Sequence, residues 1–250
     1  MTDLSLKIQI FITLHSQRLD SISTLKSAKS EVHDDIFKKV LYVALLDTLS
    51  KTIYPTRNNR ERIVLLLQNF CDWQEADKIS LPHLLRLMEM APDPAFERLR
   101  TFAFSEMESW KQGKIIPLTQ DPSSKVIRKY WPVEKELRLP VEGVGMESLK
   151  HAHLFYAYRN SLVHELRHPG YPLDVRKVGN PYYIGRAPES TNAPELSDTT
   201  FSQWELVYPV GFFRDLCSNA LKSLNDYYSR NRIDPLSFFD YASYWLTELN

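Results

Sequence analysis

The run YRNSLVHELRHPG, residues 158–170, contains residue types that can cleave a phosphodiester or bind a metal. Arg159 and Asn160 precede His164 in the pattern RNxxxH. The overlapping pattern HExxH begins at His164. From the composition of the chain, about 0.02 chance matches to the first pattern and about 0.01 to the second are expected. Neither pattern is expected by chance. The residues around them must therefore decide which of the two motifs is functional.

The HExxH pattern is typical of zinc peptidases, because His side chains at i and i+4 of one helix bind Zn²⁺ while the Glu acts as base. This arrangement needs helix through His168. Pro169 follows directly, and a proline disfavours helical backbone at the residue before it. The extended pattern HExxHxxGxxH would also need Gly and His where the chain has Tyr171 and Asp174. We therefore expect no metal here, and a zinc metallopeptidase remains the less favoured alternative.

The RNxxxH pattern suits a helix better. At about 100° per residue, Asn160 and His164 lie one turn apart on the same helix face. By the same arithmetic His153 and Arg167 point within about 60° of them. The long side chain of Arg159 can reach this face. The opposite flank is apolar and can pack against a core (Leu154, Ala157, Leu162 and Leu166).

On the motif from Arg159 to His164, and on the helices expected before and after it, the chain resembles the HEPN superfamily. Members are helical bundles that dimerise, so that two Arg-x(4–6)-His motifs face each other across a shared cleft. The resemblance implies a homodimer and an RNA substrate. It also implies a metal-independent endoribonuclease without a cofactor, of the kind found among toxins, antiviral defence effectors and RNA-processing nucleases.

The resemblance implies a role for each motif residue. His164 would take the proton of a 2′-hydroxyl or give one to the leaving 5′-oxygen. Arg159 would stabilise charge on the phosphorane, and Asn160 would hold the imidazole or the phosphate. The product would be a 2′,3′-cyclic phosphate. The other candidates for contact with RNA are His153, Arg167 and His168.

Some HEPN proteins are inactive interaction modules, and a non-catalytic HEPN-like module is therefore a second alternative. One residue departs from the family pattern. HEPN toxins silenced by a nucleotidyltransferase antitoxin often have Tyr two residues after the motif His, where this chain has Leu166. The resemblance therefore does not imply control by a nucleotidyltransferase antitoxin. An antitoxin or regulatory partner of another kind remains an open alternative.

The elements that must position the motif are mainly helical. Residues 4–22 fit both an alternating strand and a helical stripe, and the absence of Gly and Pro over the first 54 residues favours helix. We expect one HEPN-like domain over 1–250, with a loop-rich crossing that contains Pro117, Pro122, Pro132 and Pro140.

Pro169 and Gly170 should end the motif helix. The expected helices cover a stretch ending near Pro55, about 60–73, 81–90, 94–110, the motif helix at about 146–168, and C-terminal helices at about 210–248. Between the last two, residues 169–209 hold two β-rich pieces (181–185 and 204–208) that predict a small hairpin or irregular insert.

Composition narrows the class of protein. Hydrophobic residues make up 43% of the 250 residues, so disorder is not the expectation. Lys plus Arg and Asp plus Glu both number 31, which argues against a general electrostatic grip on nucleic acid but allows a local basic patch. Two widely separated cysteines, no visible signal peptide and apolar runs too short for a bilayer predict a cytoplasmic protein that does not interact with membranes.

Overall fold

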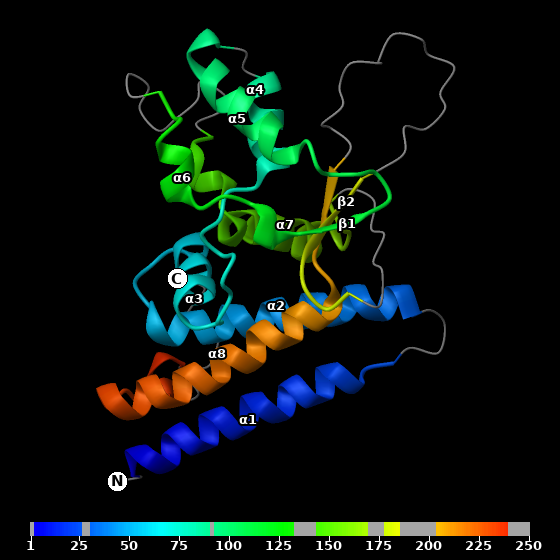
Figure 1. Cartoon of the computed structure of the whole chain (residues 1–250). Helices are drawn as coiled ribbons and strands as arrows, with labels where there is room; N and C mark the ends of the chain where they lie inside the picture. The colour runs from blue at the N-terminus through cyan, green and yellow to red at the C-terminus, as the bar shows by residue number, and fades with distance from the viewer. Residues whose placement is uncertain are drawn as a thin grey trace, which may run out of the picture. The chain divides into compact units, whose positions relative to one another are not determined.

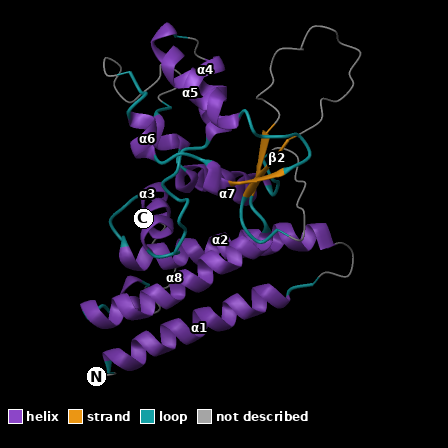
Figure 2. Ribbon diagram, in the orientation of Figure 1, coloured by secondary structure: helices purple, strands orange, loops and turns teal. Residues whose placement is uncertain are grey.

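The computed structural model describes residues 3–26, 31–90, 93–132, 144–169, 178–185 and 204–239. The described chain is mainly helical with one small sheet, as the sequence predicts (Figures 1 and 2). It divides into two compact units, residues 1–72 with 213–250 and residues 73–212. The expectation of a single domain over residues 1–250 remains a prediction.

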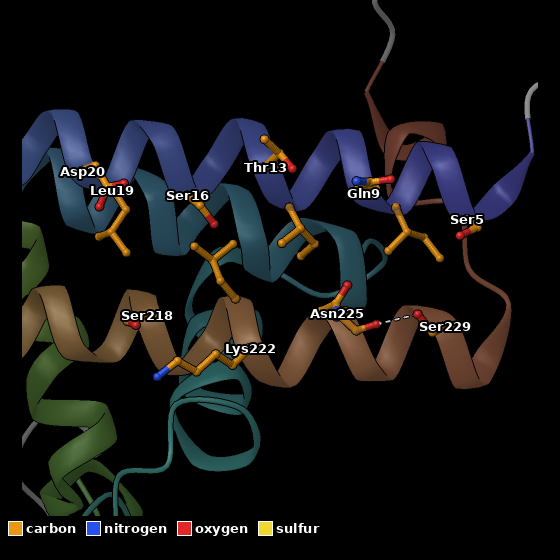
Figure 3. A pocket seen from close by; sticks show the side chains of 13 residues that line it. Ser5, Gln9, Thr13, Ser16, Leu19, Asp20, Ser218, Lys222, Asn225 and Ser229 are labelled. Carbon is orange, nitrogen blue, oxygen red and sulfur yellow. Dashed lines mark hydrogen bonds between the residues drawn. The ribbon is translucent and has the colours of Figure 1, made fainter.

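The first unit is built from long helices. Helix α1 contacts α2, α2 contacts α3, and a short 3-10 helix, η4, contacts both α1 and α2. Helices α1 and α8 lie side by side (Figure 3). The elements are α1 (Leu4–Thr24), α2 (Glu31–Ile53), α3 (Asn59–Asn69), α8 (Val210–Asn231, whose first three residues belong to the second unit) and η4 (Pro235–Phe238).

Helix α1 resolves the ambiguity of the N-terminal stretch in favour of helix. The side chain of Asp3 caps its first turn by accepting a hydrogen bond from the backbone N–H of Ser5. The buried residues follow the helical spacing of three and four (Ile8, Phe11, His15, Leu19 and Ile22). The alternating apolar residues between them, such as Leu6 and Ile10, are exposed. Burial of one helical stripe therefore decided the structure of this segment.

The second unit contains shorter helices and the sheet. Helix α4 contacts α5 and η3, and η3 leads into α7. The helical elements are α4 (Leu81–Met90), η1 (Pro94–Phe96), α5 (Glu97–Met107), η2 (Leu118–Gln120), α6 (Ser124–Arg128), η3 (Met146–Leu149) and α7 (His151–Glu165). The strands are β1 (Ile115–Pro117), β2 (Tyr182–Gly185) and β3 (Trp204–Val207).

The sheet has the order β1-β2-β3, and both pairs of strands are antiparallel. Tyr183 in the central strand lies opposite Ile116 on one side and Leu206 on the other. Strands β2 and β3 confirm the two β-rich pieces expected within the small hairpin or irregular insert, whereas residues 186–203 between them lie outside the described residues. Strand β1 was not expected, because it falls in the stretch interpreted as a loop-rich crossing. Three residues are too few for an alternating pattern, and β1 is a strand only because β2 provides a partner.

Three further expectations can be compared with the structure. The helical piece at 81–90 is confirmed as α4, and the piece at 94–110 is confirmed as η1 with α5, which ends at Met107. Helix α8 confirms the first C-terminal helix, whereas most of the second, expected to continue to about 248, lies outside the described residues. None of the described helices is both long and apolar enough to cross a membrane.

Candidate functional site

The motif lies on α7, and the start of this helix is held by backbone hydrogen bonds instead of a side-chain cap. The N–H of His151 donates to the carbonyl of Lys78 at 3.1 Å, and the N–H of Ala152 donates to the carbonyl of Ala76 at 2.9 Å. The first N–H groups of a helix have no partner within it, so these bonds satisfy two of them. They also fix the position of the helix in the second unit.

One face of α7 is buried against aromatic residues. The ring of Phe155 lies 6.1 Å from that of Trp73 and 5.4 Å from that of Tyr208, between centroids. The ring of Tyr158 lies 5.0 Å from that of Tyr208. Leu162 continues this face and is fully buried. The buried face is therefore mainly aromatic and differs from the apolar flank predicted for the motif helix. Of that flank only Leu162 is fully buried, whereas Leu154 is half-buried and Ala157 and Leu166 are exposed.

The helix ends earlier than expected, at Glu165 and not near residue 168. Leu166 adopts a left-handed conformation with φ 50°, which stops the helical hydrogen bonding. The chain then continues to Pro169. His164 thus occupies the last helical turn, whereas His168 lies outside the helix, and the HExxH residues do not share one helix face. Among the residues that the structure describes, no group of three or more His, Cys, Asp and Glu side chains could hold a metal ion.

Arg159 and Asn160 contact each other. Nη1 of Arg159 donates to Oδ1 of Asn160 at 3.1 Å, and the guanidinium carbon lies 5.8 Å from the centroid of the Tyr156 ring. Arg159 is only 9% exposed, and Asn160 is half-buried. The guanidinium is thus held by an amide and an aromatic ring on its own helix, which keeps a positive charge at a defined place.

His164 is exposed one turn beyond Asn160, as the RNxxxH spacing predicts. The two side chains start about 5–6 Å apart by helix geometry. A cationic imidazole in this last turn would also be stabilised by the negative end of the helix dipole. The arrangement therefore combines a fixed guanidinium with an accessible acid–base group within two turns of one helix.

The three additional candidates for RNA contact differ in their position and burial. His153 is half-buried on α7, but eleven residues before His164, which is about 16 Å along the helix axis. Arg167 is exposed and its Nε forms an ion pair with Glu165. Because the helix has ended, the helical angle expected for Arg167 does not apply. His168 is buried, and its Nδ1 lies 2.5 Å from the hydroxyl of Tyr158, so it anchors the chain beyond the helix.

A buried polar cluster in the second unit was not predicted from the sequence. Nε2 of His151 lies 2.7 Å from Oδ2 of Asp121, and the hydroxyl of Tyr183 lies 2.7 Å from the same oxygen and from Oγ of Ser80. Ser80 Oγ in turn lies 2.7 Å from Nδ1 of His83. The second oxygen of Asp121 accepts from the N–H of Leu81 and so starts α4. This cluster joins α4, α7 and β2.

Burial shifts the pKa values of two residues in this cluster, His83 and Tyr183. Burial lowers the pKa of His83 to about 4, with His151 as a second cause in the same direction. Burial, followed by the nearby charge of Asp121, raises the pKa of Tyr183 well above its usual value. The members lie up to about a hundred residues apart, so no local pattern could identify them.

Two cavities lie away from the motif. In the first unit, a cavity of about 530 Å³ separates α1 from α8 and is lined largely by uncharged polar side chains such as Ser16 and Asn225, with Lys222 at one side (Figure 3). In the second unit, a cavity of about 480 Å³ lies at the end of α5. Neither is lined by Arg159, Asn160 or His164.

No model of a known protein family, no curated protein and no solved structure matches this chain significantly.

Proposed function

We propose that this protein is a metal-independent endoribonuclease of the HEPN type, with Arg159, Asn160 and His164 as its catalytic residues. The observation that supports the proposal is the geometry of the motif. The guanidinium of Arg159 is held by Asn160 and Tyr156, and His164 stands exposed one turn further along α7. Metal-independent phosphodiester cleavage uses these two elements, a fixed positive charge and a titratable group that solvent and substrate can reach.

In the proposed reaction the 2′-oxygen of RNA attacks the adjacent phosphorus, and the bond from phosphorus to the 5′-oxygen breaks. One base removes the proton of the 2′-hydroxyl, and one acid protonates the departing 5′-oxygen. The products are a 2′,3′-cyclic phosphate and a 5′-hydroxyl. His164 performs one proton transfer, and Arg159 stabilises the negative charge that builds up on the phosphoryl oxygens.

The second proton transfer is assigned to His164 of a second copy of the chain. One motif contains one histidine in its exposed turn, and a homodimer with two facing motifs would provide both the acid and the base. We further propose the cytoplasm as the site of action and a biological role as a toxin or antiviral defence effector. An antitoxin or another regulatory protein could then control the activity.

A non-catalytic interaction module is the second candidate, and one observation favours it. Arg159 is 9% exposed and already has Asn160 as a partner, so both residues could serve only to stabilise α7. The two functions differ in whether RNA is cut. The zinc peptidase is less favoured than either, because His164 and His168 do not lie on one helix.

The deciding experiment incubates the purified full chain with end-labelled RNA in the presence of EDTA. We expect cleavage to continue and the 5′ fragment to carry a cyclic phosphate. A second substrate with a single 2′-deoxynucleotide at the mapped cleavage position should resist cutting at that position. Cleavage that stops on chelation and returns with added metal would contradict the mechanism, as would cutting at the deoxynucleotide.

A matched pair of variants separates catalysis from contamination. His164→Ala should abolish cleavage, because the exposed acid–base group is lost. Arg86→Ala should cut at the wild-type rate, because Arg86 is exposed on α4, pairs with Glu89 at 3.2 Å and does not belong to the motif. RNA that binds to the wild-type chain but is never cut would favour the interaction module.

A further inference from the structure

The cavity at the end of α5 has the chemical character of a binding site and is separate from the motif. Its volume is about 480 Å³, within the range of roughly 300–1,000 Å³ that is usual for small-molecule sites. The last turn of α5, the turn that follows it and the start of β3 form its walls. The residues that matter here are Phe104, Met107, Glu108, Trp110, Gln112 and Trp204.

Two tryptophans form an aromatic corner. The ring centroids of Trp110 and Trp204 are 5.2 Å apart, and their planes meet at 83°. Trp110 is buried and lies against the ring of Tyr183, with centroids 5.3 Å apart. Because Tyr183 belongs to the buried cluster around Asp121, this wall is rigidly supported.

Trp204 is positioned by the neighbouring strand. A Cβ atom added to Gly185 would lie 3.3 Å from two atoms of the Trp204 ring, which is tighter than ordinary contact. The absence of a side chain at Gly185 therefore lets this ring lie close over β2. Trp204 remains partly exposed, so its ring borders the cavity and is accessible from it.

The charged side chain that lines this corner is negative. Glu108 is exposed and is the only charged side chain among the described residues that line the cavity. The last turn of α5 also contributes to the wall, and the negative end of the helix dipole lies there. This turn contains no basic residue that would offset the dipole.

We propose that this cavity binds an organic cation of the methylated ammonium class. Aromatic faces attract such cations, and the attraction grows when the site is partly shielded from water. A quaternary methylated ammonium has no N–H groups that an apolar corner would leave without partners, whereas a phosphate would be repelled by Glu108 and by the helix end. Gln112, exposed at the rim, can accept a hydrogen bond from the remainder of the ligand.

Calorimetric titration with choline tests the charge requirement directly. The comparison ligand is 3,3-dimethyl-1-butanol, which has the same shape as choline but a neutral carbon in place of nitrogen. We expect choline to bind at least about tenfold more tightly than this alcohol. Equal binding of the two would show a merely apolar pocket, and no binding of choline at roughly 10 mM would overturn the proposal outright.

Variants of the cavity provide the matched controls. Glu108→Gln should weaken choline binding severalfold and remove most of its dependence on salt, whereas Glu106→Gln, in the same exposed helix turn but outside the cavity, should change neither. Trp204→Leu should abolish binding and Trp204→Phe should retain part of it. If Glu108→Gln binds choline as well as the wild type, the cation proposal is wrong.

The methylated ammonium could belong to a small molecule or to a trimethyllysine in a peptide. A trimethyllysine peptide and its unmethylated form, titrated under the same conditions, distinguish these sources. Tighter binding of the methylated peptide than of choline would indicate a peptide partner, and equal or weaker binding would indicate a small molecule. Either result supports the cation site, provided that the unmethylated peptide binds more weakly.

Discussion

The hydroxyl of Tyr158 lies 2.5 Å from Nδ1 of His168, across the end of α7. Both side chains are buried, although His168 follows the left-handed residue Leu166 and lies beyond the helix. The pair therefore joins the turn before Arg159 to the chain after the helix. The exposed turn that carries His164 lies between these two anchored points.

The first prediction concerns this pair. Tyr158→Phe removes the hydroxyl and leaves Nδ1 of a buried histidine without that partner, so the free energy of unfolding should fall by about 1–2 kcal/mol. Urea denaturation followed by circular dichroism measures the change. Tyr156→Phe is the control, because Tyr156 is only half-buried and keeps its aromatic face; it should change stability by less than about 0.5 kcal/mol. Equal effects of the two changes would refute an anchoring role for the hydrogen bond.

The second prediction separates the two overlapping motifs. Arg159→Ala should lower RNA cleavage by about a hundredfold or more, on the order of 3 kcal/mol of lost charge stabilisation. Glu165→Gln should leave most of the activity, because Glu165 is exposed and its contact with Arg167 lies at the surface. Gel-based cleavage rates measure both, once circular dichroism shows that both variants are folded. An inactive Glu165→Gln beside a fully active Arg159→Ala would reverse the assignment.

The third prediction is a homodimer in which the two α7 helices lie near the two-fold axis. Cleavage uses one acid and one base, and each chain offers only one exposed motif histidine, so two chains are needed. Light scattering at micromolar concentration should give twice the chain mass of 29.2 kDa. When His164→Ala chains are mixed with the wild type, each heterodimer keeps only one motif histidine, so cleavage should fall more steeply than the fraction of wild-type chain. A monomer at all concentrations would count strongly against the proposed mechanism.

The fourth prediction concerns acid stability. Burial, assisted by Arg18, lowers the pKa of His15 to about 4, and burial lowers that of His83 to about 4 as well. An unfolded histidine titrates near 6.5, so between about pH 6.5 and 4 the unfolded chain binds more protons than the folded chain. The free energy of unfolding should therefore decrease as the pH falls through this range, by up to roughly 3 kcal/mol for each histidine.

Urea titrations at a series of pH values measure this effect. His15→Leu should make the loss of stability shallower, because the ring of His15 lies beside Phe11, 4.3 Å between centroids, where an apolar side chain can pack. His15 and His83 belong to different compact units, so the comparison also shows which unit responds to acid. An unchanged slope in His15→Leu would exclude His15 as a source of the acid sensitivity.

The sequence by itself determined the helical character of the chain and the position of the motif. Stripes of apolar residues at three- and four-residue spacing, as in α1, predict helices because burial of one face dominates their stability. The short interval from Asn160 to His164 made their shared helix face predictable, since only local geometry is involved. Pro169 likewise indicated that His168 would leave the helix, although the stop at Glu165 came three residues earlier than the expected boundary.

Tertiary structure decided the rest. Strand β1 exists because β2 offers hydrogen-bonding partners, and the cluster of Asp121, His151 and Tyr183 forms because distant segments meet at one buried place. The burial of His168 and the aromatic corner at Trp110 have the same origin. Such contacts join residues far apart in the chain, so their energies depend on packing and on exclusion of water, which no local pattern in a single sequence records.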